Sequence, residues 1–164
     1  MFSGMGAFTI FHVLLSLVGI FAGFVVVFGL ITARTLDGWT ALFLGSTVLT
    51  SVTGFLFPFH GLLPSHAIGI LSLVALALAV FARYQRRLEG GWRQSYVISS
   101  MIALYFNVFI FIVQLFLKVP ALKAAAPTQT EAPFKIAQLT ALVLFIVLTI
   151  LATMRFRDIR LRTA

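Results

Sequence analysis

The chain has 164 residues, of which 61% are hydrophobic and only 10% are charged. Soluble domains carry about 25% charged residues, so this chain has too few charges to cover a surface that faces water. The net charge of +8 does not indicate nucleic-acid binding, because the basic residues lie in short segments between apolar runs, where they set membrane topology. The absence of cysteine excludes disulfides and thiolate metal sites.

The apolar runs predict membrane-spanning helices, each of which needs about 20 apolar residues. The charge-free stretch from Gly38 to Ala82 is too long for one helix, and Pro58, Gly61 and Pro64 divide it into a hairpin. The predicted fold class is all-α: a polytopic bundle of five transmembrane helices that forms one integral membrane domain over residues 1–164. The helices are predicted at about 7–31, 39–57, 65–82, 94–117 and 134–154, with one short interfacial helix in the loop 118–133.

The basic residues predict the orientation of this bundle. Nine of the twelve fall on one side of the predicted spans and three on the other. The positive-inside rule makes the richer side cytoplasmic, so the amino terminus is expected outside and the carboxyl terminus inside. The nine are Arg34, Arg83, Arg86, Arg87, Arg93, Arg155, Arg157, Arg160 and Arg162, and the three are Lys118, Lys123 and Lys135.

Each predicted helix carries a stripe of small or polar residues at helical spacing. Within lipid, helices associate through small residues and interhelical hydrogen bonds, so these stripes are expected to face the inside of the bundle. The stripes are His12, Ser16, Gly19 and Gly23 on the first helix; Ser46, Thr47, Thr50, Thr53 and Gly54 on the second; Ser65, Gly69, Ser72, Ala75 and Ala79 on the third; Tyr96, Ser100, Ala103, Asn107 and Gln114 on the fourth; and Gln138, Ala141, Thr149 and Ala152 on the fifth.

All three histidines of the chain are predicted to lie at the outer side of the membrane. One is on the inward stripe of the first helix, one is in the outer hairpin loop, and one opens the third helix. The amide side chains of Gln114 and Gln138 are expected at the same depth as the histidines, and Asn107 is expected deeper in the membrane. Polar groups inside a membrane are costly and mark a functional site by default. The predicted cofactor-binding residues are therefore His12, His60, His66, Asn107, Gln114 and Gln138.

Three chemistries fit such a group. Two histidines, His12 and His66, could hold the iron of haem b from its two sides. All three histidines, His60 included, could bind Cu or Zn, which both accept imidazole. A histidine and a glutamine could instead hydrogen-bond the carbonyls of a quinone. Since no carboxylate lies within a predicted span, the sequence argues against a carboxylate proton relay and a carboxylate-rich metal cage.

Structural explanations compete with each of these roles. His60 could simply be a polar residue of an interfacial loop, and His66 could simply be the residue at which a helix starts. His12 could form a hydrogen bond that joins two helices. Asn107 and Gln114 are more often interhelical contacts than ligands. The Ser-His-Asp order, a phosphate loop and the HExxH motif are all absent, so the chain on its own is not expected to be an enzyme.

The last two predicted helices and their loop carry the sequence Phe106-Asn-Val-Phe-Ile-Phe-Ile-Val-Gln114, then Lys118-Val-Pro-Ala-Leu and Ala126-Pro-Thr-Gln-Thr-Glu-Ala-Pro133. This part of the chain resembles small bacterial integral-membrane proteins of unassigned function. The resemblance implies a bacterial inner-membrane location and no particular activity.

Two functions from different classes remain open at this point. The first is a membrane redox or binding protein that holds haem b, Cu or Zn, or a quinone at the outer histidine site. The second is a non-catalytic accessory or scaffold subunit of a larger membrane complex. A small-solute transporter ranks third, because no inverted repeat is visible. The expected partners are the lipid bilayer and either other membrane subunits or further copies of the chain.

Overall fold

The structure is a computed structural model that describes residues 6–57 and 64–156. Within these ranges the chain forms helices joined by turns, and no strand occurs there, so the predicted all-α class is confirmed. In chain order the elements are α1 (Ala7–Ile31), α2 (Asp37–Gly54), α3 (Pro64–Val80), the π-helical turn η1 (Phe81–Gln85), α4 (Trp92–Lys118), α5 (Pro120–Ala125) and α6 (Ala132–Phe156).

The five long helices lie where the sequence predicts them, with small shifts at their ends. α2 ends at Gly54 rather than at the predicted residue 57, and a turn covers the residues that follow. α3 does not stop near Ala82 but continues through the wider π-helical turn to Gln85. The short helix predicted in the outer loop is α5, which begins at Pro120, where a proline is favoured because its missing N–H has no helical partner.

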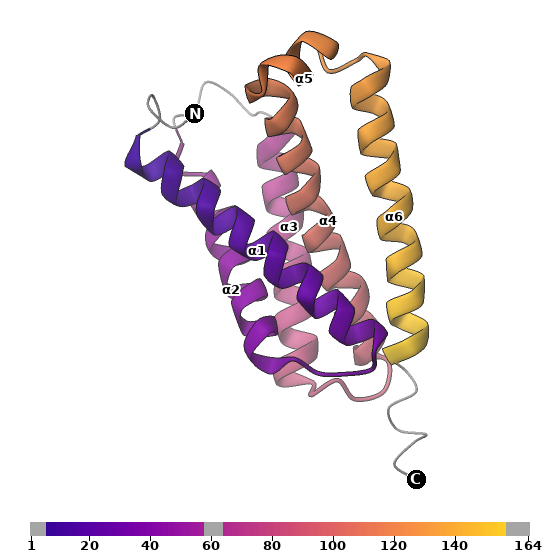
Figure 1. The fold of residues 1–164 in the computed structure, drawn as a ribbon. Helices are drawn as coiled ribbons and strands as arrows, with labels where there is room; N and C mark the ends of the chain where they lie inside the picture. Colours follow the sequence, from indigo (N-terminus) through magenta and orange to yellow (C-terminus); the bar gives the residue numbers. More distant parts are fainter. Residues whose placement is uncertain (1–5, 58–63, 157–164) are drawn as a thin grey trace.

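The helices form one bundle in which α4 is central. α4 packs against α3 and α6 along its length and also reaches α1 and α2. α1 packs most extensively against α2 and crosses the bundle obliquely, whereas α3, α4 and α6 run roughly along its long axis (Figure 1). The start of α1 and α5 lie at one end of the bundle; the turn after α1, the turn before α4 and the end of α6 lie at the other (Figure 1).

Two glycines bring α1 close to its neighbours. A Cβ atom on Gly19 would lie 3.1 Å from both Ser46 Oγ and Thr47 Oγ1 of α2. A Cβ atom on Gly23 would lie 2.5 Å from Leu104 Cδ1 of α4, which is closer than two carbon atoms can approach. The GxxxG spacing therefore serves the close helix approach for which such pairs are known in membranes.

The predicted inward stripes are confirmed for most positions. Gly19 and Gly23 of α1 are buried, as are the stripe residues at the centre of the other four long helices. Most of the other described stripe residues are half-buried, and Gln114 is exposed on the surface of α4. The buried members on the other helices are Ser46, Thr47, Ser72, Ala75, Ala79, Tyr96, Ser100, Ala103, Asn107, Ala141 and Ala152.

Four helices of the described chain are long and apolar enough to cross a membrane: Ala7–Ile31, His66–Gln85, Trp92–Lys118 and Ala132–Phe156. α2 does not belong to this group because it begins with Asp37 and contains six serine and threonine residues. Several of these hydroxyls donate to carbonyl oxygens one turn earlier in the same helix, such as Thr50 Oγ1 to Ser46 O at 2.8 Å. Such local bonds lower the cost of placing hydroxyl groups inside a bundle.

Candidate functional site

The side chain of His12 is bound to α2 in a fixed orientation. Its Nδ1 atom lies 2.8 Å from Thr53 Oγ1, and the ring packs edge-on against Phe57 with 5.1 Å between ring centroids. Thr53 Oγ1 lies 2.7 Å from the carbonyl oxygen of Leu49, which can only accept a hydrogen bond. Because the single hydroxyl hydrogen of Thr53 goes to Leu49, Thr53 accepts from His12, and Nδ1 is the protonated nitrogen. The second ring nitrogen, Nε2, then carries a lone pair.

His66 contacts a different side of α2. It is buried at the start of α3 and stacks on Phe55, with 5.8 Å between centroids and 29° between ring planes. Residues 53 and 55 point roughly 200° apart around a helical axis, since each residue turns the chain by about 100°. His12 therefore packs on the side of α2 that faces α1, and His66 packs on the side that faces α3.

The remaining predicted site residues are also distributed over several interfaces. Gln138 of α6 donates through Nε2 to the carbonyl oxygen of Phe109 on α4 at 3.3 Å. Gln114 lies on the exposed surface of α4. His60 lies outside the described residues. Within residues 6–57 and 64–156, no three His, Asp or Glu side chains come together as a group that could hold a metal ion.

Asn107 belongs to a polar cluster in the middle of the bundle, which we call the middle cluster: Ser16, Ser46, Thr47 and Asn107. Ser16 Oγ donates to Asn107 Oδ1 at 3.1 Å, so α1 and α4 are bonded here. The Asn107 amide nitrogen and the Thr47 hydroxyl are buried without a hydrogen-bond partner in the described chain. Both groups lie against Gly19, at 3.2 and 3.1 Å from the position of a Cβ atom there. Uncompensated groups of this kind are rare and call for a functional or solvent explanation.

A second polar cluster, the inner cluster, lies at the opposite end of the bundle from His12. Arg83, in the π-helical turn, forms an ion pair with Asp37 at the start of α2 although its own side chain is only 8% exposed. Its guanidinium group lies 5.4 Å from the ring centroid of Tyr96. Tyr96 is fully buried, and its hydroxyl lies beside those of Thr40 and Ser100.

From the sequence, Arg83 is predicted only to help set the membrane topology, and its contact with Asp37 is not predicted. The available signal was the absence of a helix-breaking residue between the apolar part of α3 and Arg83. An arginine that continues an apolar helix in this way has to reach either the membrane surface or a buried partner. π-helical turns are also frequent at functional positions in helices.

The inner and middle clusters are separated by an apolar layer. Phe43 of α2 and Leu104 of α4 are both 1% exposed, and both press against Gly23 of α1. Thr40 and Ser100 lie about one turn from this layer towards Arg83, and Thr47 and Asn107 lie about one turn from it towards His12. The polar groups therefore form separate layers rather than one continuous line.

Comparison with known proteins adds no further assignment: no family model matches the chain, and no curated protein or solved structure matches it. The interpretation of the site therefore depends on its own geometry. That geometry offers an oriented imidazole at His12, a partly unsatisfied amide and hydroxyl pair in the middle cluster, and an ion pair between the buried Arg83 and the exposed Asp37 in the inner cluster.

Proposed function

We propose that the chain is a five-span protein of the bacterial inner membrane, with its amino terminus outside. The fifth span is α2, whose 18 residues give a length of about 27 Å, close to the hydrocarbon thickness of about 30 Å. The distribution of charge supports the orientation. The turn after α1, the turn before α4 and the end of α6 carry arginines, whereas the opposite end carries lysines, including Lys123 and Lys135.

The cysteine-free chain allows a direct test of this topology. Single cysteines are introduced at Arg87, in the turn before α4, and at Lys123 of α5. In intact cells, a membrane-impermeant maleimide is expected to label Lys123→Cys but not Arg87→Cys, which becomes labelled only after the membrane is permeabilised. Labelling of Arg87→Cys in intact cells would contradict the proposed orientation, and labelling of both would contradict the five-span arrangement.

At the functional level we propose that His12 binds a small redox-active ligand of the quinone class in its reduced, quinol form. One observation supports this proposal above all: the hydrogen bonds from His12 to Thr53 and from Thr53 to Leu49 fix the imidazole with its Nε2 lone pair unprotonated. A quinol hydroxyl can donate to this lone pair. Second-shell bonds that orient the second nitrogen of a ligand histidine are typical of functional imidazoles.

The two other chemistries require side chains that the described structure does not bring together. A haem held by two histidines needs both imidazoles on one axis, whereas His12 and His66 contact different sides of α2. A site with three histidines would need these two side chains in one coordination sphere. A single oriented imidazole at the edge of the bundle needs no second histidine, so the quinol chemistry uses the arrangement as it stands.

The test begins with an optical spectrum of the purified protein, oxidised and then reduced with dithionite, because a Soret band that shifts on reduction would identify haem and overturn the quinol proposal. The same sample is then titrated calorimetrically with a short-chain ubiquinol. His12→Phe is expected to weaken binding by about tenfold, as expected for the loss of one hydrogen bond to a buried group. Thr53→Val keeps the shape but removes the orienting hydroxyl, and is expected to weaken binding less.

His66→Phe is the matched control for His12→Phe, because it is the same substitution on the other side of α2. Its quinol affinity is expected to equal that of the original chain. If His66→Phe and His12→Phe weaken binding equally, the effect is one of folding, and the proposed role of His12 is overturned.

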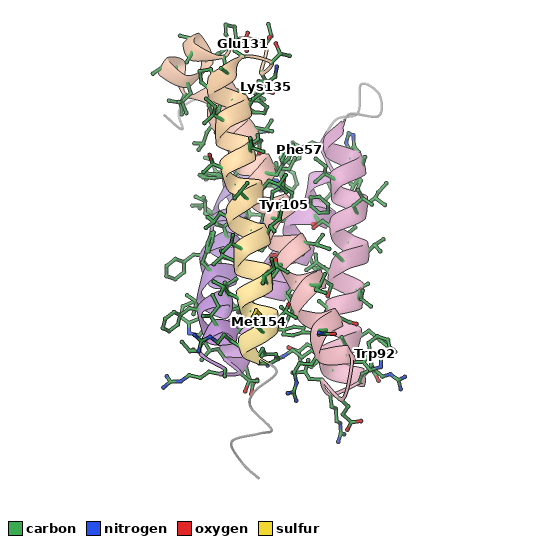
Figure 2. The ribbon with its side chains drawn as sticks, turned by 90° about the vertical axis from the view of Figure 1, so that its right-hand side faces the viewer. Phe57, Trp92, Tyr105, Glu131, Lys135 and Met154 are labelled. Carbon is green, nitrogen blue, oxygen red and sulfur yellow. The ribbon has the colours of Figure 1, made fainter. Side chains whose placement is uncertain are left out.

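An accessory subunit of a membrane complex is the second candidate. The observation in its favour is α6, whose exposed side carries large apolar side chains from Ile136 to Met154. Figure 2 shows this helix at the front of the bundle, with Met154 near its lower end. In-membrane cross-linking from a photoreactive residue at Val147 tests this candidate. Cross-links to one other protein would support it, and cross-links to lipid alone would contradict it.

A further inference from the structure

An apolar groove runs along the surface between α3 and α4. Its walls come from Leu71, Val74 and Leu78 of α3 and from Ile98, Ile102 and Phe106 of α4. Two serines also line it, but their hydroxyls are turned to their own helix: Ser95 Oγ donates to Gly91 O at 3.3 Å and Ser99 Oγ donates to Ser95 O at 2.6 Å. The groove therefore offers aliphatic and aromatic contacts and no free donor, which suits a hydrocarbon chain.

A polar pocket lies at the inner end of the same two helices. It is formed by the turn that joins them and is lined by Arg86, Arg87, Glu89 and Trp92, together with Gln85 and two glycines. The backbone is left-handed at Arg87, Leu88 and Gly90, with φ values of 49°, 58° and 53°. This conformation folds the turn back on itself. Both arginines are exposed, so their guanidinium groups are accessible to an anion at the membrane surface.

The groove and the pocket are adjacent. Gly91 lines the pocket, and its carbonyl oxygen accepts from Ser95, which lines the inner end of the groove. Beside the pocket, the ring of Phe81 packs edge-on against Trp92 with 5.2 Å between centroids, and the Arg86 guanidinium lies 4.9 Å from the Trp92 ring centroid. Figure 2 shows Trp92 at the lower end of the bundle, where the chain passes from α3 to α4. Tryptophan at such a level is typical of the membrane interface.

We propose that this combined surface is a binding site for an anionic phospholipid of the inner leaflet. The phosphate would lie between Arg86 and Arg87, and one acyl chain would lie in the α3–α4 groove. Charge complementarity favours this occupant over a neighbouring helix, because basic pockets between membrane helices on the cytoplasmic side recognise anionic headgroups. Glu89, which also lines the pocket, repels a second negative charge and so favours a lipid with one phosphate there. The inference rests on the membrane placement proposed above and is independent of the His12 site.

The test is a lipid titration of the full chain in detergent, followed by native mass spectrometry. Dioleoyl-phosphatidylglycerol is compared with dioleoyl-phosphatidylcholine, which has the same acyl chains and no net charge. The original chain is expected to bind the anionic lipid more tightly. Each arginine near an anionic headgroup is worth about fivefold in affinity, so Arg86→Gln with Arg87→Gln is expected to weaken phosphatidylglycerol binding by about 25-fold.

Two matched controls separate a built site from general attraction. Arg34→Gln with Arg155→Gln removes two exposed arginines from the same end of the bundle and is expected to leave phosphatidylglycerol affinity within about twofold. Val74→Trp fills the groove and is expected to reduce the affinity, whereas Val147→Trp on the outer face of α6 is not. If both arginine pairs reduce binding equally, or if the two lipids bind equally, the proposal is overturned.

A stable dimer that excludes lipid from the groove would also overturn the proposal, in favour of a helix as occupant. His12→Phe is expected to keep phosphatidylglycerol binding intact. Loss of the lipid site is therefore distinguishable from loss of the quinol site.

Discussion

The helices α1 and α6 have the same length and similar hydropathy, but α1 is buried much more extensively than α6. Each has 25 residues and each is apolar enough to cross a membrane. In α1, 39% of the most apolar 18-residue window is buried within the bundle, whereas in α6 the corresponding share is 11%. α1 packs against α2, α4 and α6, while α6 packs mainly along α4 and α1.

The difference arises from small residues rather than from hydropathy. α1 carries glycines where it crosses α2 and α4, so backbones approach closely and the polar groups of the middle cluster lie at the contact. α6 carries few small residues in its central turns and packs through Ala141, Phe145 and Ala152. Because lipid tails are as apolar as leucine, hydropathy gives no preference between these two positions; packing and hydrogen bonds decide.

The largest expected effect comes from widening the closest contact of α1. Gly23→Val places a branched side chain against Leu104 and Phe43, which are already in contact with the glycine. Overpacking of this kind is expected to lower the free energy of unfolding by about 3 kcal/mol. The measurement is equilibrium unfolding in mixed micelles with increasing dodecyl sulfate.

The matched control for this prediction is Gly45→Val on α2, where an added Cβ meets no atom within 4 Å. The same substitution there is expected to change stability by less than about 0.5 kcal/mol. Equal losses from both variants would show that backbone propensity, and not the close approach of α1, determines the effect.

The same substitution, valine to alanine, compares the packing of α1 and α6 directly. Val26 of α1 is 3% exposed and Val147 of α6 is 47% exposed. Val26→Ala leaves a small cavity and is expected to cost about 1.5 kcal/mol in the same unfolding experiment. Val147→Ala is expected to cost less than about 0.5 kcal/mol, because lipid fills the space. A larger cost at Val147 would show that α6 is covered by protein in the membrane.

Hydrogen bonds provide a third and smaller contrast. Asn107→Ala removes the bond from Ser16 between α1 and α4, and is expected to cost about 1 kcal/mol, part of which is offset because an unpaired amide nitrogen disappears. Gln138→Ala removes the longer bond from α6 to Phe109 O and is expected to cost about 0.5 kcal/mol. A larger loss of stability for Gln138→Ala than for Asn107→Ala would show that the α6 hydrogen bond stabilises the bundle more than the middle cluster does.

The smallest effect concerns pH and the loop that precedes α6. Partial desolvation raises the pKa of Glu131, but hydrogen bonds from the Thr128 hydroxyl and from backbone N–H groups of this loop outweigh it, so the pKa lies below its ordinary value of 4.5. A lowered pKa stabilises the folded loop above pH 4.5, and this contribution is lost as the pH falls through the folded-state pKa. The protection factors for amide exchange at Thr128 and Thr130, whose N–H groups donate to the Glu131 carboxylate, are therefore expected to fall in acid, whereas in Glu131→Gln they are already low at neutral pH.

Much of the architecture follows from the sequence because it depends on local patterns. Runs of about 20 apolar residues, prolines and isolated charges fix the number of long helices and most of their ends, and small residues at helical spacing identify the inward faces of α1 and α4. The basic residues predict which ends lie together, and the ribbon places those ends together (Figure 1). The extension of α3 through a π-helical turn to a buried Arg83 was not visible in these patterns.

What the sequence by itself determined is that the histidines at 12 and 66 lie near one end of the bundle, because depth along a helix follows from counting residues. Only the tertiary structure decided that α2 lies between them and that Thr53 orients one of them. The physical reason is that the angular position of a side chain around its helix, relative to a neighbour, depends on how distant segments pack. That packing also decided that the buried side chain of Arg83 forms an ion pair with the exposed Asp37, 46 positions away in sequence.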